Sequence, residues 1–219
     1  MPGMRPYRSL QDLPSMLPVF PLSGVLLLPR GDLPLNIFEP RYLAMTDEAL
    51  SGARMIGMIQ PVFAEEGGER PALSAVGCAG RITAYRETDD GRYLITLTGI
   101  CRFRIGQELD VTTPYRQVEP DYGPFETDLY PDEDGEFPRE RLLGALKRYL
   151  VRRDLKADWQ SVTSAPAEAL VNSLAMLCPF EPAEKQALLE ASGWPERVDT
   201  LIALLEMAAS DRPGGATLN

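Results

Sequence analysis

The feature that most constrains the fold of this chain is a change in apolar periodicity part-way along it. Through the first 120 residues, apolar side chains occur in short runs interrupted by proline and glycine, which is typical of β-strands. From residue 138 onward they recur three and four positions apart, as in amphipathic helices. The sequence therefore predicts an α+β protein, with a twisted N-terminal β-sheet or pseudo-barrel followed by a C-terminal helical bundle.

The clearest local element is a hairpin. Residues 81–85 and 93–97 both alternate apolar and polar side chains, and Asp90-Gly91 between them suits the positive φ of a tight turn. In the next run Cys101, Phe103 and Ile105 should point to one face and the two arginines to the other. Further strands are predicted at residues 17–20, 25–28, 35–38, 55–60, 61–63 and 115–119.

One helix is predicted inside the β-rich part, from Pro40 to Gly52. Proline is tolerated in the first helical turn, and glycine suits the C-terminal cap. The spacing places Leu43, Asp47 and Leu50 on one face of this helix.

An acidic stretch divides the chain. Residues 121–137 carry seven acidic side chains and no basic one, so a solvated linker is expected there, with a contact site for a basic partner as the alternative. The predicted division is a β-rich domain at 1–120, the linker, a helical bundle at 138–210 and a disordered tail at 211–219. The four helices are expected at residues 138–154, 166–178, 182–191 and 195–209.

Charge and composition exclude several functions. The formal net charge is −10, with −2 on residues 1–120 and −8 on the rest. Binders of nucleic acid or anionic membranes normally rely on basic residues, so both partners are disfavoured. The absence of histidine removes Ser-His-Asp and Cys-His catalysis and His-ligated zinc. We expect no catalytic residue, no metal and no cofactor.

Cysteine usage and the start of the chain indicate a cytoplasmic protein. Cys78, Cys101 and Cys178 are odd in number and contain no CxxC pair, which fits buried thiols in a reducing compartment. No apolar leader follows Met1, and no apolar run approaches the roughly 20 residues that span a bilayer.

Several motifs resemble the N-terminal domain family of Lon-type ATP-dependent proteases. The most specific is the run from Leu33 to Tyr42, Leu-Pro-Leu-Asn-Ile-Phe-Glu-Pro-Arg-Tyr, and the resemblance covers about residues 14–207. Similar runs occur at residues 17–22, 26–29, 77–82, 90–93, 99–103 and 184–190. The resemblance implies a PUA-like β region and a substrate-recognition module. No Walker A sequence occurs, and the family's Ser-Lys protease domain has no counterpart here.

The function that follows is non-catalytic binding of proteins or peptides. The expected partners are unfolded or degradation-prone polypeptides, or a protein partner such as a protease or unfoldase for which the chain acts as an adaptor. The alternative is RNA binding by the PUA-like region, against which the acidic charge argues. An enzyme would need carboxylate or cysteine chemistry that the sequence does not reveal.

Two candidate binding sites stand out. In the first, Phe38 and Tyr42 are expected to fill the core at a strand-to-helix corner, with Glu39 at the positive end of the helix and Arg41 paired with a carboxylate. Alternatively, the residues of this first site contact a ligand directly. In the second, Arg102 and Arg104 form either a solvated strand face or a cationic strip for acidic peptides or RNA phosphates.

Overall fold

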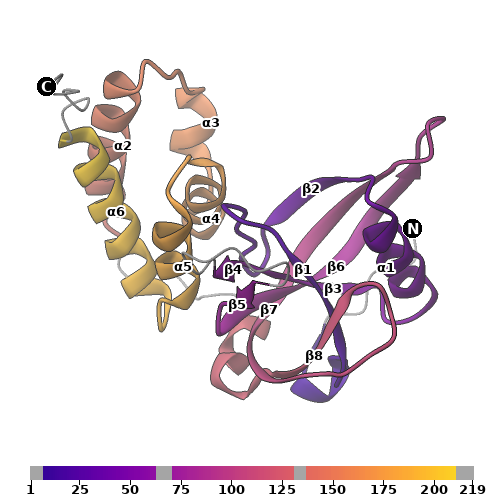
Figure 1. Ribbon diagram of the computed structural model, residues 1–219. Coiled ribbons are helices and arrows are strands. Elements are labelled where there is room, and N and C mark those ends of the chain that lie inside the picture. Colours follow the sequence, from indigo (N-terminus) through magenta and orange to yellow (C-terminus); the bar gives the residue numbers. More distant parts are fainter. Residues whose placement is uncertain (1–6, 63–70, 131–136, 211–219) are drawn as a thin grey trace, which may run out of the picture. The chain divides into compact units, whose positions relative to one another are not determined.

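The computed structural model describes residues 7–62, 71–130 and 137–210 (Figure 1). The chain divides into two compact units, residues 1–131 and 132–219. The first unit contains the strands β1 (Leu17–Pro21), β2 (Asp32–Ile37), β3 (Met55–Ile59), β4 (Pro61–Val62), β5 (Ala72–Leu73), β6 (Val76–Glu87), β7 (Tyr93–Glu108) and β8 (Arg116–Asp121), the helix α1 (Pro40–Ser51) and the 3-10 helices η1 (Leu10–Asp12) and η2 (Gly123–Leu129).

Six strands of the first unit form one sheet that closes on itself. Their order is β2-β7-β6-β3-β1-β8, and β7 also pairs with β8. The long strand β7 makes this closure possible, because its first half pairs with β2 and its second half with β8. All pairings are antiparallel except that of β1 with β3. The predicted α+β class and pseudo-barrel are confirmed, with β2 left as an outer edge strand.

The core of the first unit lies inside this barrel. Leu17 and Phe103 are fully buried there, and a Cβ on Gly57 would meet both side chains. Phe103 can enter because Gly77 faces it: a Cβ on Gly77 would lie 2.7 Å from the Cζ atom of the ring. Cys78 and Cys101 are buried as well, and Cys178 is buried in the second unit, with none of the three in a disulfide. The predicted buried thiols are therefore confirmed.

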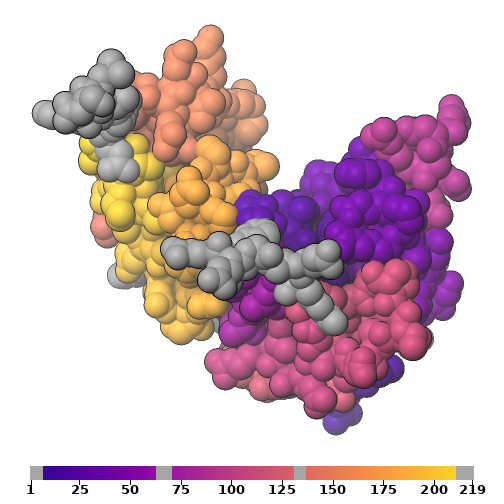
Figure 2. Space-filling view, in the orientation of Figure 1, coloured from indigo at the N-terminus to yellow at the C-terminus, as the bar shows by residue number. Residues whose placement is uncertain are grey.

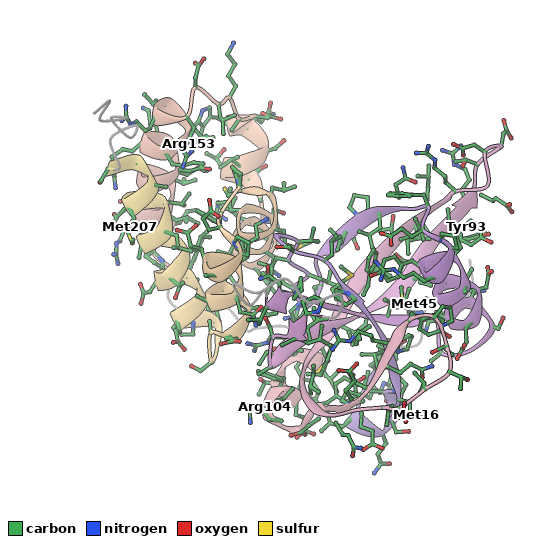
Figure 3. The ribbon with its side chains drawn as sticks, viewed as in Figure 1. Met16, Met45, Tyr93, Arg104, Arg153 and Met207 are labelled. Atoms are coloured by element: carbon green, nitrogen blue, oxygen red, sulfur yellow. The ribbon has the colours of Figure 1, made fainter. Side chains whose placement is uncertain are left out.

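One strand predicted in the first unit does not form. Residues 25–28 are largely buried but form no strand, since they run between β1 and β2 as a coil. The helix α1 begins and ends as predicted, and it buries Tyr42, Met45, Thr46 and Ala49. The labelled Met45 lies in the part of the unit where α1 covers the sheet (Figure 3).

The acidic stretch 121–137 is not a linker along its whole length. Strand β8 extends to Asp121, and η2 follows it directly. Phe125 and Asp128 of η2 are buried, so this segment belongs to the core of the first unit. Residues 131–136 of the expected linker and the expected disordered tail at 211–219 lie outside the described residues.

In its described part the second unit consists of helices. Each opens beside proline or a capping residue, as helix N-termini commonly do. The helices are α2 (Arg139–Arg152), α3 (Trp159–Ser164), α4 (Ala167–Leu177), α5 (Pro182–Glu190) and α6 (Trp194–Ser210).

Helices α2 and α6 run side by side in the second unit (Figure 1). Salt bridges of 3.5 Å from Arg141 to Asp199 and 3.1 Å from Arg148 to Glu206 join residues seven positions apart on each helix, so the two helices run in the same direction. The buried core of the bundle follows the predicted 3.6-residue stripes. Its members include Leu142, Leu146, Tyr149, Leu170, Val171, Leu188, Leu189, Val198, Leu201, Ile202 and Leu205.

Candidate functional site

The strand-to-helix corner at residues 38–42 is part core and part surface. Tyr42 is buried and its ring centroid lies 4.2 Å from that of Phe20. Burial raises the pKa of the Tyr42 hydroxyl. Glu39 occupies the N-cap of α1 and pairs with Arg41, whose Nε and Nη2 atoms lie 2.9 and 2.7 Å from Glu39 Oε2. These three residues agree with the expected roles.

Phe38 does not fill the core as expected. Its side chain is 61% exposed, and the guanidinium carbon of Arg92 lies 5.9 Å from its ring centroid. The reason is strand alternation: Ile37, the preceding residue, is buried, so Phe38 follows on the opposite side of the chain. Phe38 is therefore available for contact, whereas Tyr42 is anchored.

The expectation that Arg102 and Arg104 both point outward is wrong for Arg102. Arg102 is 2% exposed and is held by Asp128 of η2, with Nε to Oδ2 at 2.8 Å and Nη2 to Oδ1 at 2.9 Å. Its guanidinium carbon also lies 4.6 Å from the Phe125 ring centroid. Arg104 is exposed, on the opposite side of the first unit from α1 (Figure 3). A cationic strip of both arginines therefore does not form, because η2 covers the outer face of β7 at Arg102.

A groove of about 710 Å³ lies beside α1 in the first unit. Its walls come from four stretches of chain: the end of β1 with the following loop, the start of α1, the flanks of β4 and β5, and the loop before β8. In the space-filling view the surface of that last loop adjoins the surface of α1 (Figure 2). The lining residues are Pro21, Leu22, Ser23, Arg41, Tyr42, Pro61, Pro71, Val111, Thr113, Pro114, Tyr115 and Arg116.

Local hydrogen bonds fix the loops that form this groove. The backbone N–H of Leu22 donates to the Ile59 carbonyl at 3.0 Å, and that of Gly24 donates to Gln60 Oε1 at 3.1 Å. On the other wall the Tyr115 hydroxyl donates to a carboxylate oxygen of Glu48 on α1. Burial and this carboxylate raise the pKa of Tyr115. The groove is thus held by the fold itself before any ligand binds.

The groove combines apolar surface with positive charge. Four of its lining residues are prolines, and three of them, Pro21, Pro61 and Pro71, lie at or next to the end of a strand, where proline is tolerated. In the part of the chain that the structure describes, the lining contains two arginines and no carboxylate. The carboxylate of Glu108 balances the charge of the Arg116 guanidinium, with Nε to Oε1 at 2.8 Å and Nη2 to Oε2 at 2.5 Å.

Sequence reasoning located only part of this groove. It singled out Arg41 and Tyr42, but missed the opposite wall, including Val111 and Tyr115. The prolines at strand ends were the available signal, since they mark the positions where loops leave the barrel. That these loops meet in space depends on barrel closure, which pairs β8 with both β1 and β7.

Two smaller hollows lie elsewhere. One of about 450 Å³ is formed by β2, β6 and β7 around Leu94, and one of about 510 Å³ lies in the second unit around Phe137 and Trp194. In the part of the chain that the structure describes, no three His, Cys, Asp or Glu side chains come together as metal ligands. Within the same residues, no helix has the length and apolar character needed to cross a membrane.

Comparison with known proteins identifies the family. Residues 16–207 match the model of the ATP-dependent protease La (LON) substrate-binding domain. The Lon protease of Roseiflexus castenholzii is 33% identical over 107 residues, or 49% of this chain and 13% of the relative. Lon protease 2 of Thermus thermophilus is 26% identical over 211 residues, or 89% of this chain and 24% of the relative. The chain thus corresponds to a small part of these curated relatives.

Solved structures give the same result. A Lon N-terminal domain protein from Xanthomonas campestris matches with a TM-score of 0.59 and 25% identity, covering 86% of this chain and 97% of that one. The N-terminal domain of the Mycobacterium avium complex Lon protease matches with a TM-score of 0.57 and 18% identity, covering 87% and 97%, and supports the fold alone. With the family model spanning most of its length, the chain belongs to the Lon substrate-binding domain family.

Proposed function

We propose that this protein binds unfolded or degradation-prone polypeptides and that the groove beside α1 is the binding site. The observation that carries the proposal is a preformed hollow of about 710 Å³ lined by prolines, aliphatic side chains and two tyrosines. Hollows of this size accommodate small ligands or a few side chains of a peptide. Family membership supports the same class of function, since the matching model describes a substrate-binding domain.

The expected binding is weak, on the order of micromolar, because ordering a flexible segment costs part of the contact energy. Nothing in the proposal requires catalysis by this chain. The relatives carry similar sequence within Lon proteases, so the proposed partner beyond the client is an ATP-dependent protease or unfoldase that receives the bound polypeptide.

A matched pair of variants tests the groove. Val111 lines the groove and Leu94 lines the hollow formed by β2, β6 and β7, and both are half-buried aliphatic residues. A carboxylate introduced at Val111 would be desolvated by a bound apolar peptide, which is costly. We expect Val111→Asp to weaken binding by about tenfold or more, equivalent to at least about 1.4 kcal/mol, and Leu94→Asp to leave it unchanged.

The measurement is fluorescence anisotropy of a labelled, uncharged peptide of about eight residues with leucine and phenylalanine at its centre. Melting curves of both variants report whether each remains folded. Equal binding by wild type and Val111→Asp would exclude the groove. Loss only in Leu94→Asp would move the site to the other hollow.

A further inference from the structure

We propose that the groove prefers apolar segments that carry a carboxylate, that Arg41 binds this carboxylate, and that Glu39 competes with it. The proposal rests on the proposed function, since it concerns the same groove. It adds a chemical class of client, an apolar segment beside an acidic group, and assigns the preference to one pair of residues.

The charge of the groove favours an acidic ligand. Among the described residues, its lining contains Arg41 and Arg116 and no carboxylate. Arg116 is committed to the fold, because its side chain is 16% exposed, its fork is taken by Glu108, and its Nη1 atom donates to the Pro71 carbonyl at 2.7 Å. Of these two arginines, Arg41 is therefore the one that a ligand can reach.

The geometry of Arg41 suits this role. Its side chain is 53% exposed, and its guanidinium carbon lies 4.5 Å from the centroid of the Tyr42 ring, which is a wall of the groove. The buried ring thus holds the planar guanidinium at the groove while its edge can still meet a carboxylate. Arginine forks match carboxylates with two parallel hydrogen bonds, which gives geometric selectivity as well as attraction.

The ion pair between Arg41 and Glu39 can be exchanged for one between Arg41 and a client carboxylate. Both hydrogen-bonding nitrogens of Arg41 converge on one oxygen of Glu39, whose side chain is 42% exposed. Exposed ion pairs contribute little net free energy, so a client carboxylate can replace Glu39 at small cost. Because Glu39 competes for Arg41, we expect a carboxylate alone to bind too weakly to displace it. A client should therefore offer apolar contacts together with the carboxylate.

Three labelled peptides of equal length test the preference. The first is amide-terminated with a Leu-Phe-Asn-Val centre, the second replaces the asparagine with aspartate, and the third ends in Leu-Phe-Val with a free carboxylate. At low salt, where screening is weak, we expect the aspartate peptide to bind wild type about two- to fivefold more tightly than the asparagine peptide. The third peptide shows whether a chain-terminal carboxylate serves equally well.

Three variants of the protein show which residue causes the preference for the aspartate peptide. Arg41→Ala should bind the aspartate and asparagine peptides equally, whereas Glu39→Gln should tighten the aspartate peptide about twofold and leave the asparagine peptide unchanged. Arg104→Ala is the matched control, since it removes an exposed arginine outside the groove and should retain the wild-type preference. A merely structural role for Glu39 would not alter the discrimination between two peptides that differ by one charge.

The outcomes separate this proposal from the function on which it rests. Equal binding of the aspartate and asparagine peptides by wild type, with binding still lost in Val111→Asp, would overturn the carboxylate preference alone. A preference that survives Arg41→Ala would overturn the assignment to Arg41. Failure of all three peptides to bind would overturn both the preference and the peptide-binding function.

Discussion

At the residue scale, two side chains take the opposite environment from the one their chemistry suggests. Arg102 is buried and Phe38 is exposed. Strand alternation correctly places Arg102 opposite Phe103, but the outer face of β7 is covered by η2, whose Asp128 lies 26 residues further along the chain. The sequence contains both partners, and nothing local in it indicates that they meet.

The first prediction compares two phenylalanines. Phe38→Ala should lower the free energy of unfolding by less than about 1 kcal/mol, because its exposed ring loses at most a weak cation–π contact with Arg92. Phe103→Ala, at a fully buried position, should cost about 3–5 kcal/mol. Urea denaturation of both variants measures the difference. Similar costs for the two would mean that Phe38 is buried in solution.

At the element scale, alternation and period predicted most strands, helix α1 and four of the five helices described in the second unit. The hairpin of β6 and β7 followed from alternation, and Gly91 has the positive φ expected of its turn. Helix α3 was missed because it is short and buries no residue, and depends on its Asp158 cap. Element η2 was missed because its acidic composition resembles that of a linker, although Phe125 and Asp128 are buried.

The second prediction concerns how η2 is held. Removing the carboxylate in Asp128→Ala leaves the Arg102 guanidinium buried without its ion-pair partner, and breaking a buried pair in this way typically costs about 3–5 kcal/mol. Asp90→Ala removes an exposed partner of Arg92 and should cost less than about 1 kcal/mol. Denaturation curves provide the comparison. A small cost at Asp128 would show that η2 is not fixed by this pair.

At the scale of the whole molecule, the candidate site is assembled from stretches of chain that are far apart in sequence. The corner at residues 38–42 was recognisable because its motif is contiguous. The groove was not, since its walls at Leu22, Tyr42 and Val111 come together only when the barrel closes. A site of this kind follows from topology more than from motif.

The third prediction is a pH profile. Without histidine, and with the shifted carboxyl pKa values all lowered, stability should be nearly constant between about pH 5.5 and 8. Burial raises the pKa of the Cys101 thiol to about 12 and that of Cys178 to about 11. Unfolded thiols ionise near pH 9, so this contribution to stability is complete below that pH and is lost as pH rises toward 11–12.

Thermal melts across pH 5–11 check this profile. The lowered pKa of Lys185, caused by burial, acts in the opposite direction on the alkaline side. Replacing both Cys101 and Cys178 with alanine should therefore reduce the alkaline loss. A sharp transition near pH 6.5 would contradict the account, because it would require a carboxyl group with a strongly raised pKa.

The most direct test of peptide binding in the groove is photo-crosslinking. A peptide with benzoylphenylalanine at the centre of its apolar run is irradiated with the wild-type protein, and the modified residues are identified by mass spectrometry. The account predicts adducts concentrated at residues 21–23, 41–42, 111 and 113–116, all of which line the groove, and their loss on competition with unlabelled peptide. Competable adducts confined to the helices at residues 139–210, or to the sheet face around Leu94, would contradict it.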